Sequence, residues 1–179
     1  MTASVLPRGV LAGLVLLLGA VATPASALDR GQPPPQALGT GPNFSVLRTP
    51  DYAGRILVVT FWASWCGPCL NEMSVLERLQ QEAGDQLAVV SVNIESLARF
   101  REVRRVLSKR LSLTLAHDGD GSVRKAWGVG PIPHMFMIDH EGRVAYEHRG
   151  YGNDFIPSLV DEVNELLRRQ AHPDPASTP

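Results

Sequence analysis

Two cysteines, Cys66 and Cys69, lie between a predicted buried strand and a predicted helix, with only Gly67 and Pro68 between them. The run Ile56–Trp62 is almost continuously β-branched or aromatic, which is typical of a strand buried on both faces. Proline suits the first turn of a helix, and apolar residues then recur at helical spacing until Gly84. The sequence therefore predicts a strand–turn–helix unit with both cysteines at the start of the helix.

A cysteine at this position is chemically favoured as a nucleophile. The unpaired N–H groups and the dipole at a helix N-terminus stabilise an anion, so we expect the pKa of Cys66 to lie below that of a free cysteine. Cys69 follows one helical turn later on the inner side, close enough to form a disulfide. Such a bridge closes too small a loop to restrain the unfolded chain much. The pair is therefore predicted to be a reversible redox couple, with an exposed Cys66 and a recessed Cys69.

The rest of the chain alternates between strands and helices. Further strands are predicted at 44–47, 87–94, 113–116, 135–138 and 144–148, and further helices at 97–110, 123–127 and 154–169. Alternation that ends in a hairpin and a helix implies an α/β fold, with a mixed central sheet flanked by helices. We find no internal repeat and no second domain.

The first 27 residues predict a secretory signal peptide. Arg8 precedes the apolar run Gly9–Ala22, and Ala25 and Ala27 fit a signal-peptidase site. An uncleaved membrane anchor is the alternative, but the apolar run of about 14 residues is shorter than the roughly 20 that span a bilayer. We expect cleavage after Ala27 and a protein located in a bacterial-type periplasm.

The exported chain is predicted to have three parts. Residues 28–42 are rich in Gly, Pro and Gln and are predicted to form an extended leader without a core of its own. A single domain is expected over 43–170, followed by a disordered tail over 171–179. Apolar residues make up 44% of the 179 residues, which is enough for one core.

Charge and cysteine content exclude several classes of function. The formal net charge of −1 gives no general attraction to nucleic acid. A structural zinc site would need two more ligands, and there is no second cysteine pair. We expect no cofactor, no resident metal and a monomer. The segment 118–121 has the aspartates and glycines of a calcium loop but lacks its later ligands, so a plain turn is predicted.

The segment 61–69 resembles the active-site motif of the thioredoxin superfamily, because a strand and Trp65 precede the two cysteines and a helix follows. The segment 128–139 resembles the loop in which that superfamily carries a cis-proline before a main strand, and Pro133 matches the proline. The resemblance implies a thioredoxin fold and a thiol–disulfide oxidoreductase. It also implies that Trp65, Ile132 and Pro133 shape the surface on which a substrate docks.

The sequence is most similar to the exported TlpA/ResA-like branch of the superfamily. The signal peptide, the inserted helix–strand segment 97–116 and Glu72 carry this resemblance, which covers roughly 44–169. In that branch the matching glutamate lies near the buried thiol and manages its proton, so Glu72 is a candidate catalytic residue. A solvent-exposed helix glutamate is the alternative.

Three positions depart from the patterns of relatives. Thr60 stands where cytosolic thioredoxins have a buried aspartate, so Glu72 or water must accept the proton. Ser74 stands where many relatives have a proline. His134 and Met135 follow the cis-proline where many relatives have two threonines. A histidine there would raise the thiolate fraction of Cys66, change which partners dock, or face solvent without effect.

The resemblance implies a reductase of exported proteins. Expected clients are apocytochrome c or the oxidised copper site of a respiratory oxidase subunit, and the expected electron donor is a membrane thiol transporter. Two alternatives remain: a disulfide oxidant or isomerase, and a Cu(I)-binding metallochaperone that uses Cys66 and Cys69, with or without His134. The arginines of the predicted helix 97–110 form either a partner-docking patch or a solvated helix face.

Overall fold

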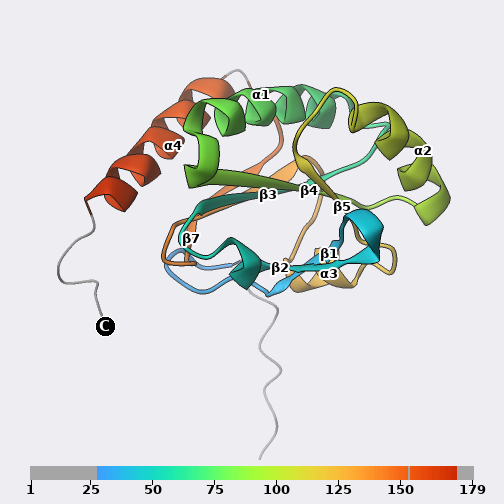
Figure 1. Ribbon diagram of the computed structural model, residues 1–179, viewed down its shortest axis with the longest axis horizontal. Coiled ribbons are helices and arrows are strands. Elements are labelled where there is room, and N and C mark those ends of the chain that lie inside the picture. Colours follow the sequence, from blue (N-terminus) through green and yellow to red (C-terminus); the bar gives the residue numbers. More distant parts are fainter. Residues whose placement is uncertain (1–27, 153, 173–179) are drawn as a thin grey trace, which may run out of the picture.

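The computed structural model describes residues 28–152 and 154–172. Within these residues a seven-stranded sheet runs through the molecule, with strand order β2-β1-β5-β4-β3-β6-β7 (Figure 1). The strands are β1 (Ala37–Thr40), β2 (Val46–Arg48), β3 (Ile56–Trp62), β4 (Leu87–Asn93), β5 (Thr114–His117), β6 (His134–Ile138) and β7 (Val144–Arg149).

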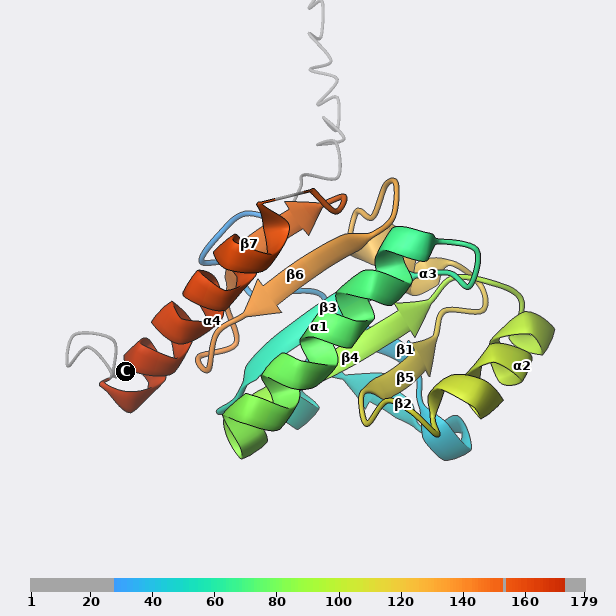
Figure 2. The same ribbon diagram turned by 90° about the horizontal axis from the view of Figure 1, so that it is seen from above.

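In the described part of the chain, four α-helices cover the two faces of this sheet. They are α1 (Gly67–Ala83), α2 (Leu97–Leu107), α3 (Ser122–Ala126) and α4 (Phe155–Ala171). Helices α1 and α4 lie on one face, with α2 on the same side beyond β5, and α3 lies on the other face (Figures 1 and 2). The arrangement confirms the predicted α/β fold with a mixed sheet between helices.

The sheet is parallel at its centre and antiparallel towards both edges. Strand β3 pairs in parallel with β4, and β4 with β5, as expected where helices connect successive strands. Strand β6 pairs antiparallel with both β3 and β7, so the predicted terminal hairpin is confirmed. Because β3 lies between β4 and β6, the turn that follows it emerges at the middle of the sheet edge.

Two apolar clusters hold the layers together, one on each face. The first joins α1, α2 and α4 to the sheet and contains both cysteines with Met73, Met135 and Met137. The second joins α3 and β1 to the opposite face through Phe61, Trp127 and Phe136. Residues alternate between the clusters along each central strand, as the pleat of a β-strand requires. All residues of β3 and β4 are buried, which explains why both sequences are mostly apolar.

The prediction that residues 28–42 form an extended leader without a core is wrong for the second half of this segment. Strand β1 pairs with β2 and β5, and Leu38 is fully buried in the second cluster. Gly39 permits this pairing, because a Cβ at its φ of 93° would lie 2.6 Å from the carbonyl oxygen of His117. Further upstream, Gly31 donates its N–H to the carbonyl of Val144 at 2.8 Å. Hydrogen bonds therefore join this segment to β2 and β5 towards one edge of the sheet and to the start of β7 at the other edge.

Smaller differences concern where elements begin and end. The predicted strand at 44–47 is observed as the edge strand β2, which starts two residues later because Phe44 belongs to a short 3-10 turn. Helix α2 ends three residues before its predicted end. Helix α1 is unbroken, and Ser74 donates its hydroxyl hydrogen to the Leu70 carbonyl within it.

The predicted signal peptide over 1–27 lies outside the described residues. Most of the predicted tail over 171–179 also lies outside them, although Ala171 is the last residue of α4. In the part of the chain that the structure describes, none of the helices combines the length and the apolar character needed to cross a bilayer.

Candidate active site

Cys66 and Cys69 form a disulfide at the N-terminus of α1, with their Cα atoms 5.3 Å apart. Cys66 is the N-cap residue, and its sulfur accepts a hydrogen bond from the backbone N–H of Cys69 at 3.2 Å. An exposed Cys66 and a recessed Cys69 were predicted, but both are buried, with Cys66 5% exposed and Cys69 1% exposed. The adjacent Trp65 is far more accessible, at 71% exposure.

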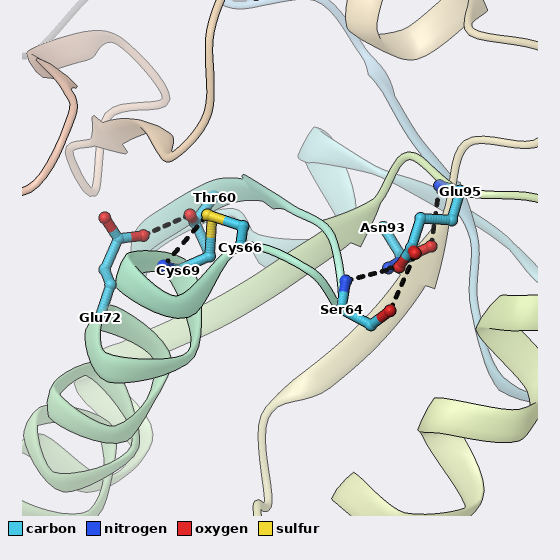
Figure 3. The surroundings of a disulfide bond; sticks show 7 residues. All are labelled: Thr60, Ser64, Cys66, Cys69, Glu72, Asn93 and Glu95. Carbon is cyan, nitrogen blue, oxygen red and sulfur yellow. Dashed lines mark hydrogen bonds between the residues drawn. A yellow bond between two sulfur atoms is a disulfide. The ribbon is translucent and has the colours of Figure 1, made fainter.

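Glu72 lies beside the disulfide on the same helix, with its carboxylate next to Thr60 (Figure 3). Only 1% of its surface is exposed. The alternative of a solvent-exposed glutamate is therefore wrong. Thr60 of β3 donates its hydroxyl hydrogen to Glu72 Oε1 at 2.5 Å. The second carboxylate oxygen, Oε2, has no hydrogen-bond partner among the described residues.

The surroundings of Glu72 change its acidity. Burial penalises the charged carboxylate and raises the pKa of Glu72 from 4.5 to about 7, although the hydrogen bond from Thr60 acts in the opposite direction. A carboxyl group with a pKa near neutral populates both protonation states at physiological pH. Because Glu72 and Cys69 are three residues apart on one helix, both face the same buried side.

The Ile132–Pro133 peptide bond is cis, which confirms the predicted geometry of this loop. Pro133 is buried, and its carbonyl accepts the backbone N–H of Gly150 at 2.8 Å. Ile132 is half-buried and packs against the cluster that contains both cysteines. The structure thus brings the loop to the same core as the disulfide, and a role for Ile132 and Pro133 in substrate binding stays a prediction.

His134 is buried at 1% exposure, so the proposal that it faces solvent is wrong. Its ring stacks on Phe136 with centroids 4.6 Å apart, and its Nε2 lies 2.8 Å from Glu147 Oε1. Burial lowers the pKa of His134, against the opposing effect of Glu147. Along β6 it is Met135, not His134, that joins the cluster of Cys66 and Cys69.

The face of His134 also bears on the copper-binding alternative. In that alternative His134 is an optional third ligand beside the two cysteines, but His134 and Phe136 lie on the opposite face of the sheet. No three His, Cys, Asp or Glu side chains gather as a possible metal site within 28–152 and 154–172. The segment 118–121 forms a turn, and the carboxylate of Asp118 accepts the backbone N–H groups of Val123 and Arg124 at the start of α3.

The arginines of α2 lie mostly on its surface. Arg101 and Arg105 are exposed, and the guanidinium of Arg101 lies 5.6 Å from the ring centre of Phe44. Arg104 is half-buried over the ring of Phe100. A docking role for this helix stays a prediction.

Two contacts of the site were not predicted from the sequence. One is the hydrogen bond from Thr60 to Glu72, and the other joins Ser64 to Glu95. Ser64 follows β3 and Glu95 follows β4, and these strands are parallel neighbours. The carboxyl ends of parallel strands meet at the same edge of a sheet, so polar residues that follow two neighbouring parallel strands are expected to lie close together. This sequence pattern could have predicted the contact between Ser64 and Glu95.

Comparisons with known proteins agree with this geometry. The sequence model of the Redoxin family matches residues 30–167. The thiol-disulfide oxidoreductase ResA of Bacillus thuringiensis subsp. konkukian is 27% identical over 167 residues, which cover 87% of this chain and 91% of ResA. The thioredoxin-like protein YneN of Bacillus subtilis is 33% identical over 102 residues, which cover 56% of this chain and only 59% of YneN.

A solved structure extends the similarity to three dimensions. A Chlorobium tepidum protein assigned as the thiol:disulfide interchange protein DsbE superposes with a TM-score of 0.70 at 29% identity. The superposition covers 78% of this chain and 99% of that protein. The similarity in fold therefore extends over most of this chain.

Proposed function

This chain belongs to the Redoxin family, and from that membership we propose that it reduces disulfide bonds of exported proteins through Cys66 and Cys69. It is a thiol–disulfide oxidoreductase of the TlpA/ResA-like type. The observation that carries the proposal is the buried Glu72, with a pKa near neutral, behind a disulfide at a helix N-terminus. The reductive direction, the clients and the location are the proposed part.

The first step is nucleophilic attack by the reduced protein. The Cys66 thiolate, favoured by the N-terminus of α1, attacks one sulfur of the client disulfide. A new bond forms between Cys66 and that sulfur, the client bond breaks, and the other client sulfur leaves as a thiolate that takes up a proton from water. Trp65 and the loop at Ile132 and Pro133 would hold the client chain during this step.

The second step resolves the mixed disulfide. Cys69 transfers its proton to the Glu72 carboxylate, and the resulting thiolate attacks the sulfur of Cys66. The bond between Cys66 and the client breaks, and the client leaves as a thiolate that is then protonated. In total the client gains two electrons and two protons, and the protein ends with the Cys66–Cys69 disulfide.

The oxidised protein must then be reduced again. We assign this step to a membrane thiol transporter that carries electron pairs out of the cytosol and exchanges thiols with the Cys66–Cys69 disulfide. The proposed clients are apocytochrome c, whose haem-binding cysteines must be reduced, and the oxidised copper site of a respiratory oxidase subunit. The proposed location is the periplasm, after cleavage at Ala27. The sequence Gly67-Pro68 between the cysteines matches that of thioredoxin, which supports the reductive direction.

The proposal is tested with a disulfide-bonded peptide that contains the haem-binding motif Cys-x-x-Cys-His. Pre-reduced protein is mixed with the oxidised peptide, and free thiols are counted by alkylation and mass spectrometry. We expect one peptide disulfide to be reduced for each protein disulfide formed. In Glu72→Gln, formation of the mixed disulfide should keep its rate while its resolution slows by about tenfold or more, as for the loss of a general base. If oxidised protein instead oxidises the reduced peptide and the reverse reaction fails, the protein is an oxidant and the proposal is wrong.

A further inference from the structure

The residues just before the nucleophile form a tight turn that presents Trp65 to solvent. The backbone N–H of Cys66 donates to the carbonyl of Ala63 at 3.1 Å, which closes a four-residue turn. In such a turn the N–H of the second residue, here Ser64, has no partner within the turn. Trp65 is the third residue and is 71% exposed, whereas Ala63 is fully buried. The turn therefore sets the direction of Trp65 and the approach to Cys66.

Glu95 supplies the partner that the turn lacks. Its Oε2 accepts the backbone N–H of Ser64 at 2.6 Å, and its Oε1 accepts the Ser64 hydroxyl at 2.9 Å (Figure 3). Partial burial by itself raises the pKa of Glu95, but the hydrogen bonds from Asn93 and Ser64 outweigh it, and the pKa is lowered. The Glu95 carboxylate is therefore charged at neutral pH, and it binds the turn by accepting hydrogen bonds from both the backbone N–H and the hydroxyl of Ser64.

Glu95 is itself held in place from several directions. The fully buried Asn93 donates its side-chain amide to Glu95 Oε2 at 3.0 Å and accepts the backbone N–H of Glu95 at 3.0 Å. A ring nitrogen of His117 lies 2.8 Å from the carbonyl oxygen of Glu95. On the far side of the turn, Arg99 of α2 donates to the Ser64 hydroxyl at 3.0 Å. The turn is thus fixed to β4 and α2 by side chains outside the cysteine motif.

From this geometry we propose that Glu95 is a positioning residue, which holds Ser64 so that Trp65 and Cys66 are presented in one orientation to protein clients. The inference rests on the proposed function in that the client is a protein disulfide. Glu95 does not touch the sulfur atoms in the contacts described, so its effect passes through the turn. A client that docks on Trp65 depends on that orientation, whereas a small disulfide that needs only the sulfur of Cys66 does not.

The test is Glu95→Gln, compared with the matched control Glu102→Gln. Three donor groups converge on the two oxygens of Glu95, so an amide in its place turns an N–H donor towards one of them. Glu102 pairs with the same Arg99 at 2.9 Å but is 67% exposed, and among the described residues its side chain makes no hydrogen bond to the turn. Each variant is assayed with the haem-motif peptide and with hydroxyethyl disulfide.

For Glu95→Gln we expect KM for the peptide to rise by about fivefold or more, with kcat and the hydroxyethyl disulfide rate within about twofold of wild type. Glu102→Gln should match wild type in both assays. For Ser64→Thr, which keeps the hydroxyl, KM for the peptide should stay near the wild-type value. For Ser64→Ala, KM for the peptide should rise, as in Glu95→Gln. An unchanged KM, or an equal loss with both substrates, would overturn the inference. Failure of the wild-type protein to reduce the peptide at all would instead count against the proposed function.

Discussion

The hydroxyl of Thr60 donates a hydrogen bond to the carboxylate of Glu72 across the contact between strand β3 and helix α1. Both side chains are buried, at 0% and 1% exposure, and both face the cluster that contains the cysteines. The strand thus lacks an acidic residue of its own at this position, and the helix provides the carboxyl group. The neutral hydroxyl orients that group without adding a second charge to the core.

Protonation of Glu72 makes folding stability depend on pH. Its pKa is about 7 in the folded chain and 4.5 without burial, so between these values the folded state binds more protons than the unfolded state. The contribution of Glu72 to stability is therefore greatest below about pH 4.5 and falls as the pH rises through about 7, by up to about 3 kcal/mol. Urea unfolding of the oxidised protein across this range measures the effect.

Glu72→Gln should flatten that pH dependence, because glutamine does not titrate. The matched control is Glu82→Gln, which removes an exposed carboxylate from the same helix and should leave the profile unchanged. Equal profiles for wild type and Glu72→Gln would show that Glu72 does not titrate in this window.

Thr60→Val should raise the pKa of Glu72 above its wild-type value. The hydrogen bond from Thr60 lowers this pKa, and valine keeps the shape of threonine without the hydroxyl. The Glu72 carboxyl is titrated by infrared spectroscopy in the oxidised protein, where neither cysteine ionises. Thr60→Ser retains the donor and should stay close to wild type. No difference between the Val and Ser variants would mean that the hydroxyl does not act on Glu72.

Cys69→Ser and Cys66→Ser should behave differently with a disulfide-bonded peptide. Without Cys69, attack by Cys66 still occurs but the mixed disulfide cannot be resolved, so a covalent adduct should accumulate. Without Cys66, the more deeply buried Cys69 should form little adduct, because it lies on the buried side of the first turn of α1. Non-reducing electrophoresis and mass spectrometry detect the adduct. Preferential accumulation in Cys66→Ser would reverse the assigned roles.

Trp65→Ala should weaken client binding without loss of stability. The indole is 71% exposed, so its removal should change the free energy of unfolding by no more than about 0.5 kcal/mol. The KM for the peptide should rise severalfold because an exposed aromatic contact is lost. Phe44→Ala is the control, since Phe44 is equally exposed but lies next to the edge strand β2. If both variants leave KM unchanged, Trp65 is not part of the docking surface.

Local sequence patterns predicted the centre of this site well. The apolar run of β3, the cysteine pair and the helix that follows are contiguous, and Pro133 was recognised from its own loop. The burial of Glu72 required the packing of α1 on β3, which joins residues 12 positions apart. The contact between Ser64 and Glu95 spans 31 positions and depends on the pairing of β3 with β4.

Other features depended on long-range pairing that the sequence does not display. Strand β1 lies in a segment rich in Gly and Pro, and its ladder partner His117 is far along the chain. The orientation of His134 was ambiguous because β6 is buried on both faces, so its alternation does not reveal which face carries α1. Only the assembled sheet assigns Met135 to the cysteine side and His134 to the other.

The equilibrium reduction potential of the Cys66–Cys69 pair decides whether the pair acts as a reductant. Purified protein is equilibrated in dithiothreitol or glutathione buffers of known potential, and its redox state is followed by tryptophan fluorescence and thiol trapping. We expect a value near that of thioredoxin, about −270 mV, at which the reduced pair donates electrons to client disulfides. A value near that of DsbA, about −120 mV, would instead assign the protein to disulfide formation and show that the pair is not a reductant.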